Sequence, residues 1–127
     1  MKAGKILEHN ELTEKIIGCA IKVHKKLGPG FLESIYENAF MLELEKQNLD
    51  VERQQEVIVK YDGVEVGRHR LDLIVNNTIV VELKAVKNIE DVHFAIVKSY
   101  LKALRKEHGL IINFSKPVLE VKRVIHK

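Results

Sequence analysis

The sequence has few of the residues that mark disulfide-stabilised, metal-cluster or membrane-spanning proteins. Cys19 is the only cysteine, which excludes an internal disulfide and a multi-cysteine metal site and fits a reducing compartment. No apolar run approaches the roughly 20 residues needed to span a bilayer. The N-terminal stretch MKAGKILEHNELTEK lacks the uninterrupted apolar segment of a signal peptide. We therefore expect a cytoplasmic protein with no membrane partner.

The chain also lacks the features that separate domains. Its only two prolines, Pro29 and Pro117, each lie at the edge of a patterned segment, and no repeat or Pro/Gly/Ser linker is present. The net charge of +3 permits a polyanionic partner but is too small to identify a nucleic-acid binder. We expect residues 1–127 to form one domain, which is a common length for a single core.

Two helices are predicted in the first part of the chain. Apolar residues recur at three- and four-residue spacing over 11–27, which indicates a helix with one buried stripe. The segment LGPG (27–30) ends this helix, because glycine permits the helix-ending conformation and proline cannot continue the hydrogen-bond ladder. A second helical pattern extends from Phe31 to about Gln47, with Glu33 in its first turn.

The middle of the chain is strand-like. Residues 51–61 are predicted to form one strand, Asp62 and Gly63 a hairpin turn, and residues 64–75 the returning strand. A third strand is expected at about 79–86. This stretch contains three charged residues, Asp72, Glu82 and Lys84, in otherwise apolar strands.

One helix and two strands complete the prediction. Asn88 is expected to cap a helix from about 89 to 106. Residues 109–114 have the composition of a buried strand, and residues 118–126 alternate as an outer strand does. The predicted order is helix, helix, three strands, helix, strand, strand.

Strand alternation predicts which side chains share a face. In residues 64–75, one face is expected to hold Leu71, Leu73 and Val75, and the other Arg68, Arg70, Asp72 and Ile74. On the next strand, Glu82 and Lys84 share a face opposite to Val81 and Leu83.

The length of the loop between these strands decides how the charges pair. A two-residue loop would split the two acids between faces. A three-residue loop, residues 76–78, unites the apolar side chains on one face, which burial favours. It sets Asp72 opposite Glu82, Arg70 opposite Lys84, and Leu73 opposite Val81.

Paired carboxylates repel unless a cation lies between them. Carboxylate oxygens suit a hard divalent ion, so Asp72 and Glu82 predict a site for Mg²⁺ (or Mn²⁺). Lys84 would add a positive group able to orient a water or to stabilise charge on a phosphate. This combination is typical of metal-assisted phosphodiester hydrolysis.

At these residues the sequence resembles the PD-(D/E)XK nuclease superfamily, and within it the small proteins named for a GxxExxY signature. The signature is present as Gly30, Glu33 and Tyr36. The resemblance extends from about residue 11 to 125 and takes in VHKKLGPGFLESIYE, RLDLIV, VVELKAV, SYLKA and GLIINF in order. It implies an α/β fold of restriction-endonuclease type, a three-layer αβα core with a mixed β-sheet flanked by helices.

The resemblance also assigns roles by position. It implies that Asp72 and Glu82 are metal-binding acids, that Lys84 is the catalytic lysine, and that Glu33 is a further acid of the catalytic and metal site. The implied function is a Mg²⁺-dependent nuclease that hydrolyses nucleic acid, with DNA the expected substrate. Two positions depart from the pattern: Leu71 replaces the proline of the superfamily name, and Ile96 stands four residues before Tyr100, where glutamine is expected.

Simpler roles remain open for these residues. Glu82 and Lys84 can form a same-face ion pair on a half-exposed strand, and Glu33 can favour the positive end of its helix. Tyr36 and Tyr100 are expected to be core aromatics with satisfied hydroxyls. The alternative function is a catalytically inactive nuclease-fold module that binds nucleic acid or a protein partner.

Basic residues suggest how nucleic acid would bind. Lys98 and Lys102 lie with Arg105 and Lys106 on one side of the third predicted helix, and with Arg68 and Arg70 they suggest a phosphate-binding track. A solvated helix face explains the lysines nearly as well. Because one active site cuts one strand, cleavage of a duplex would need a homodimer or a larger complex.

Overall fold

The computed structural model describes residues 9–127, and the first eight residues, where part of the expectation of no signal peptide falls, lie outside the described residues. The elements in chain order are α1 (His9–Leu27), α2 (Glu33–Lys46), β1 (Val51–Arg53), β2 (Glu56–Tyr61), β3 (Val64–Arg70), β4 (Leu73–Val75), β5 (Ile79–Lys84), α3 (Asp91–Leu104), β6 (His108–Asn113) and β7 (Glu120–Ile125). Within residues 9–127, no helix has the length and apolar content required to cross a membrane.

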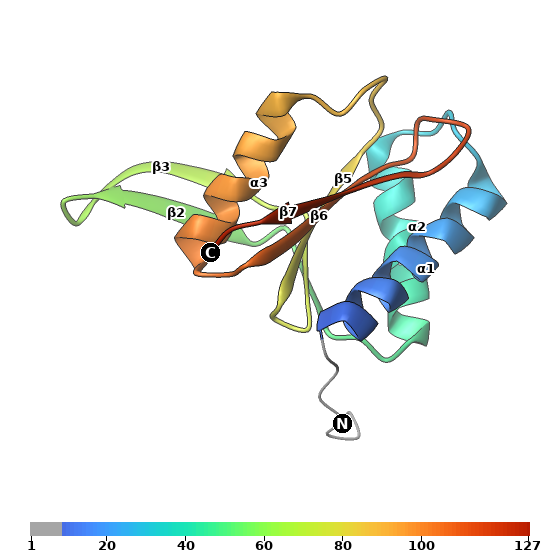
Figure 1. Ribbon diagram of the computed structural model, residues 1–127, viewed down its shortest axis with the longest axis horizontal. Coiled ribbons are helices and arrows are strands. Elements are labelled where there is room, and N and C mark those ends of the chain that lie inside the picture. The colour runs from blue at the N-terminus through green and yellow to red at the C-terminus, as the bar shows by residue number, and fades with distance from the viewer. Residues whose placement is uncertain (1–8) are drawn as a thin grey trace.

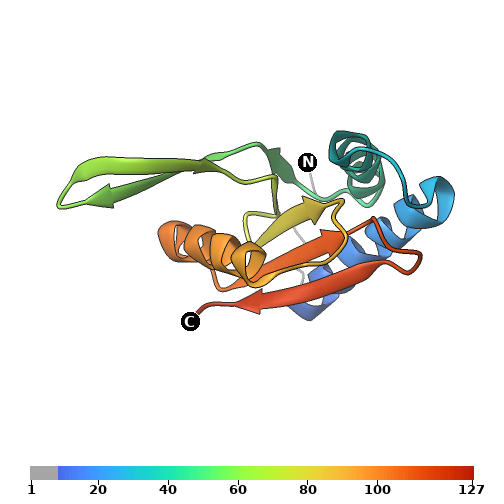
Figure 2. The same ribbon diagram turned by 90° about the horizontal axis from the view of Figure 1, so that it is seen from above.

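A five-stranded mixed sheet forms the middle layer. Its strand order is β1-β4-β5-β6-β7, with β5 and β6 parallel and the other neighbours antiparallel. Helices α1 and α2 cover one face, and α3, which connects the two parallel strands, covers the other (Figures 1 and 2). This arrangement confirms the predicted αβα core with a mixed sheet.

Alternating residues of the same strands belong to two separate hydrophobic cores, one on each face of the sheet. Leu73, Val81 and Leu83 pack toward α1 and α2. Ile74 and Val80 pack toward α3, where they meet side chains such as Leu101. Because both faces are covered by helices, β4 and β5 are buried along almost their whole length. Any charged group on these strands is therefore taken out of water.

The predicted three-residue loop is present between β4 and β5. Leu73 pairs with Val81 and Val75 pairs with Ile79, which leaves residues 76–78 as the turn. Asn76 and Asn77 both have positive φ, 50° and 52°, a conformation that asparagine tolerates better than most residues. The register that unites the acids is thus confirmed.

The two long strands predicted at 51–61 and 64–75 are each interrupted, and that part of the prediction is wrong. Their outer halves, β2 and β3, leave the main sheet as a separate two-stranded ribbon, which we call the arm (residues 56–70). Figures 1 and 2 show the arm projecting beyond the helices and the sheet. Gln54, at φ 53°, bends the chain between β1 and β2.

The break also corrects two predicted side-chain positions. Leu71 packs toward α3 together with Ile74, rather than sharing a face with Leu73, because the alternation is reset at Asp72. Arg70 pairs with Glu56 in the arm and therefore does not lie opposite Lys84. Alternation holds only while consecutive residues stay in one regular strand.

The third helix starts two residues later than predicted. Its N-cap is Glu90 rather than Asn88, and Glu90 forms a capping box with His93. The main-chain N–H of Glu90 donates to His93 Nδ1 at 2.8 Å. Reciprocal bonding of this kind satisfies two main-chain donors at the helix start, which a single asparagine cap does not.

Candidate functional site

Asp72 and Glu82 meet at the point where the arm joins the sheet. The main-chain N–H of Asp72 donates to Glu82 Oε1 at 3.0 Å, and the N–H of Leu83 donates to Asp72 Oδ2 at 2.8 Å. The carboxylate of each acid is thus held by a main-chain N–H beside or at the other acid. Glu82 is 4% exposed, and Asp72 is partly buried. The structure brings together the two carboxylates that the sequence pattern paired.

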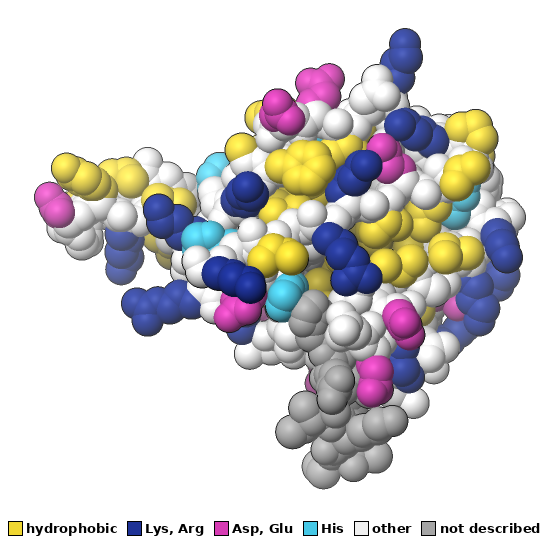
Figure 3. Space-filling view, viewed as in Figure 1, with side chains coloured by type: hydrophobic (Ala, Val, Ile, Leu, Met, Phe, Trp, Pro, Cys, Tyr) yellow, Lys and Arg dark blue, Asp and Glu magenta, His cyan; other side chains and the backbone are white. Residues whose placement is uncertain are grey.

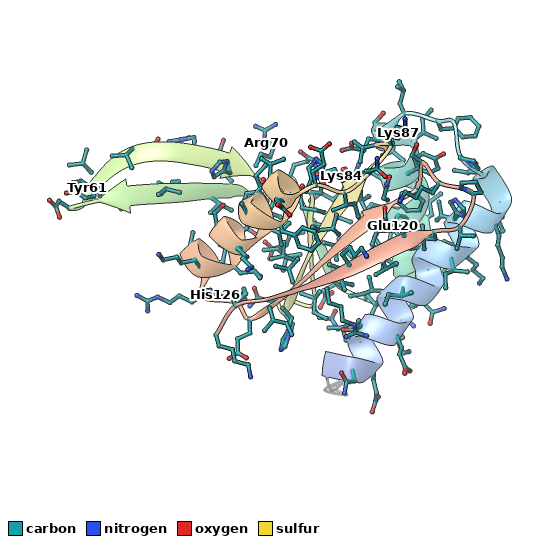
Figure 4. All side chains as sticks on the ribbon, turned by 45° about the horizontal axis from the view of Figure 1, so that its top comes forward. Tyr61, Arg70, Lys84, Lys87, Glu120 and His126 are labelled. Atoms are coloured by element: carbon teal, nitrogen blue, oxygen red, sulfur yellow. The ribbon has the colours of Figure 1, made fainter. Side chains whose placement is uncertain are left out.

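Lys84 lies two residues beyond Glu82 on β5. Its Nζ is 3.5 Å from Glu82 Oε2, and its side chain is 21% exposed. The same-face ion pair considered from the sequence is therefore present. Figure 4 shows Lys84 at the end of β5, on the side of the molecule where Arg70 and Lys87 also lie. The lysine is placed between a buried acid and solvent.

The two carboxyl groups hold protons more tightly than usual. The pKa of Asp72 is raised from 3.8 to about 6, by burial first and also by the negative charges of Glu33 and Glu37, against the hydrogen bond from Leu83 and the charge of Lys84. Burial raises the pKa of Glu82 from 4.5 to about 7, and the charge of Asp72 adds to this effect. The positive charge of Lys84 therefore does not offset the burial and mutual repulsion of the two acids, and an added cation would stabilise their charged forms.

Helix α2 supplies two more acids near Asp72. Glu33 is its first residue and Glu37 follows one turn later, so both lie on one helix face. The carboxylate of Glu37 is occupied, because it accepts hydrogen bonds from Arg53 Nη2 at 2.7 Å and from Gln54 Nε2 at 3.0 Å. Among residues 9–127, none donates a hydrogen bond to the exposed Glu33 carboxylate or pairs with it.

Sequence reasoning missed Glu37. The signal was its four-residue spacing from Glu33, which places both acids on the same side of a helix. The first-turn position of Glu33 also agrees with the simpler role at the positive end of the helix.

Helix α3 closes the site from the other side. Tyr100 is buried, as predicted for a core aromatic, and burial followed by the charges of Glu82 and Asp72 raises its pKa to about 12. Its hydroxyl therefore stays protonated at neutral pH. Ile96, at the position where glutamine was expected, packs partly buried into the α3 core.

A different glutamine, Gln55, is half-buried near the same strands. Leu71 donates its main-chain N–H to the carbonyl of Gln55 at 3.0 Å, which places Gln55 directly across from the residue before Asp72. Gln55 Oε1 is the one buried side-chain atom in the described residues with no hydrogen-bond partner. An unpaired buried amide oxygen is a group that a water or ligand would satisfy.

The residues present fit a small divalent cation. Mg²⁺ keeps several waters and commonly takes only one or two carboxylates from the protein, together with oxygens of a phosphate. Asp72 and Glu82 meet that requirement. Within residues 9–127, Asp72 Oδ1 accepts no hydrogen bond, and the one ion pair of Glu82 Oε2 is with Lys84. The part of the chain that the structure describes has no closed cluster of three or more His, Cys, Asp or Glu ligands.

Gly30 and Tyr36 shape the chain before α2. The Tyr36 hydroxyl donates to the carbonyl of Gly28 at 2.6 Å and accepts from the N–H of Phe31 at 3.1 Å. Its ring stacks on Phe114 with centroids 4.5 Å apart, and the residue is fully buried. Tyr36 is therefore the satisfied core aromatic that was predicted. Its hydrogen bonds fix the turn that delivers Glu33 to the site.

The basic residues predicted to contact phosphates are divided between the arm and α3. Arg68 is bonded to Glu65 and Glu56, each at 2.8 Å. Arg70 is more exposed and lies 3.8 Å from Glu56. Lys98 and Lys102 are exposed on α3. Of the two arginines, Arg70 is nearer to Asp72 in the chain and has the longer contact with an acid.

Comparisons with known proteins concern the fold and the family of the chain. No curated protein matches the sequence. A solved structure titled "Crystal structure of SSO0001" is similar in fold, with a TM-score of 0.58 and 19% identity, over 92% of this chain and 59% of that chain. The family model described as the PD-(D/E)XK nuclease superfamily matches residues 10–124. The chain therefore belongs to the PD-(D/E)XK nuclease superfamily.

Proposed function

We propose that this protein is a Mg²⁺-dependent nuclease that hydrolyses phosphodiester bonds of DNA, and that it is one of the GxxExxY proteins of the superfamily. One observation carries the proposal. Two buried acids, Asp72 and Glu82, lie together with raised pKa values while Lys84 stands at the solvent side of the pair. Buried, repelling carboxylates are costly in a purely structural role and useful in a cation site.

Asp72 and Glu82 would hold the metal, and Glu33 would add an acid from α2. A bound Mg²⁺ would polarise the phosphate and make a bound water more acidic. Lys84 would orient the attacking water and stabilise negative charge as it develops on the phosphate oxygens. Tyr100, whose hydroxyl keeps its proton, would act as a donor beside the acids. Glu37 would position the junction between α2 and β1 through Arg53 and Gln54.

The substrate would lie across the side of the molecule that holds Lys84. Arg70 and Lys87 lie on that side in Figure 4, and Lys98 and Lys102 would continue the contacts along α3. Arg68 would contribute less, because two carboxylates already neutralise it. We further propose that two copies act together, since one site cuts one strand of a duplex.

A cleavage assay tests the proposal. Purified protein is incubated with single-stranded and duplex DNA and with RNA, in Mg²⁺, in Mn²⁺ and in EDTA. We expect cleavage of DNA that needs the metal and is lost in Asp72→Asn. Glu65→Gln is the matched control, because it removes an acid from the arm, away from the site. Binding of DNA without metal-dependent cleavage would instead support the inactive binding module.

A further inference from the structure

The arm has one charged face and one apolar face. Residues paired across the ribbon alternate between these faces, so Glu56 and Arg70 share a face with Ile58 and Arg68. The opposite face carries Val57 with His69, Val59 with Gly67, and Tyr61 with Val64. Val66 is the extra residue of the β-bulge and has no partner in the pairing.

The body of the protein covers only the base of the apolar face. Val57 is 2% exposed, and the ring of His69 packs edge-on against Tyr100 of α3 with centroids 5.5 Å apart. Farther out on this face, Tyr61 is 70% exposed and Val64 is 64% exposed. Figure 4 labels Tyr61 at the tip of the arm, and hydrophobic side chains reach that tip in Figure 3. A hydrophobic surface that begins in the core thus continues into solvent.

Gly67 leaves a gap in this apolar face. A Cβ built on Gly67 would meet nothing within 4 Å, and its φ is not in the positive range. Tyr61 belongs to the next cross-strand pair on the same face, two residues beyond Val59 and roughly 7 Å farther along the ribbon. The same face therefore presents a large projecting ring and an empty position next to it, which is what a self-complementary contact requires.

The charges of the arm favour a second copy over nucleic acid. Lys60, Arg68 and Arg70 are balanced by Glu56, Asp62 and Glu65, so the arm has three positive and three negative residues and no net charge. The excess of +3 belongs to the rest of the chain. Two positively charged copies can therefore contact each other through their arms without electrostatic repulsion. A phosphate backbone would gain no attraction from a net positive charge on the arm.

We propose that the arms of two copies pack apolar face to apolar face about a two-fold axis, with Tyr61 of each copy seated over Gly67 of the other. This inference rests on the pairing of copies included in the proposed function but not on the chemistry of the acids. It assigns the interface to Tyr61, Val64 and Gly67. The charged face of each arm stays in solvent.

Light scattering during size-exclusion chromatography tests the interface. The parent is expected at twice its 14.6 kDa mass. In Gly67→Val the gap is filled, so the dimer should dissociate, while the monomer should fold with an equal or higher melting temperature, because a β-branched residue suits a strand better than glycine. Tyr61→Ser should raise the dimer dissociation constant by roughly thirtyfold or more, as loss of an aromatic anchor does.

Ile58→Thr is the matched control, because Ile58 is 44% exposed on the charged face and its replacement should leave the dimer intact. A monomeric parent would overturn the inference, and so would a dimer that survives both Gly67→Val and Tyr61→Ser. If the parent is monomeric but loses DNA binding on Tyr61→Ser, the face serves nucleic acid instead. Mass is measured without metal or substrate, so failure of the nuclease site leaves this test unaffected.

Discussion

The arm and the point where it joins the sheet, which we call the junction (Asp72 and Glu82), place charged residues in opposite environments. Every residue of β3 is exposed, whereas every residue of β4, which starts three positions later, is buried. In the arm, a hydrogen bond from Arg68 lowers the pKa of Glu65. At the junction, burial raises the pKa of Asp72 to about 6 and that of Glu82 to about 7. Carboxylates therefore change their pKa values in opposite directions on the two sides of Leu71.

The difference identifies which charges need a function to explain them. An exposed ion pair costs little to form and contributes little, so the pairs of the arm require no further account. Two buried acids that repel each other destabilise the fold unless something is gained. A bound cation would offset the repulsion between the two acids. The following predictions test whether the charged residues of the junction bind a cation and affect stability, and whether those of the arm do neither.

The largest effect is expected from Lys84→Met. Loss of the positive group beside Glu82 should reduce DNA cleavage by roughly 10²- to 10⁴-fold, the usual contribution of a positioned proton-transfer group. Binding of Mn²⁺, measured by calorimetry, should persist because both acids remain. Lys25→Met, which removes an exposed lysine of α1 away from the site, is the control and should retain most activity. Equal losses in both variants would contradict a special role for Lys84.

The second prediction concerns the pH dependence of stability without metal. The pKa values of Asp72 and Glu82 lie above their ordinary values of 3.8 and 4.5, so the native state keeps protons that the unfolded chain releases. Their contribution is full below about pH 4 and is lost as pH rises through 6 and 7. Urea unfolding in EDTA should show a loss of roughly 3 kcal/mol for each acid over this range. In Glu82→Gln the slope should be smaller, and an unchanged slope would disprove the assignment.

The third prediction concerns the effect of added metal on stability. At a hundredfold excess over its dissociation constant, Mg²⁺ should stabilise the parent by about 2.7 kcal/mol and leave Glu82→Gln unaffected. In EDTA, Glu82→Gln should be as stable as the parent or more stable, because repulsion with Asp72 is removed. A loss of about 3 to 5 kcal/mol in EDTA, with no effect of metal on the parent, would show that Glu82 serves only to neutralise Lys84.

The smallest effect is expected in the arm. Arg68→Gln removes the hydrogen bonds to Glu65 and Glu56, but all three side chains are well exposed. Solvent and salt screen such pairs, so the melting temperature should not change measurably. A clear loss of stability that disappears in high salt would mean that the arm depends on its ion pairs, and the contrast with the junction would be weaker than we infer.

Part of the site was accessible from local sequence. The alternation of apolar residues around Asp72 and Glu82, together with the three-residue loop, was enough to pair the two acids, because a hairpin register depends on near neighbours. Glu37 was not identified, because its contacts with Arg53 and Gln54 depend on how α2 packs against β1. The arm was missed for a similar reason: one positive φ at Gln54 interrupts a strand without any change in composition.

The sequence by itself determined the helices, the β4–β5 register and the pairing of Asp72 with Glu82, since these follow from side-chain periodicity and turn length. Only the tertiary structure decided which face each residue of the interrupted strands occupies, how deeply the acids are buried and which acid of α2 keeps its oxygens available. The physical reason is that pKa values and exposure depend on everything packed around a group. That environment is assembled from segments far apart in the chain.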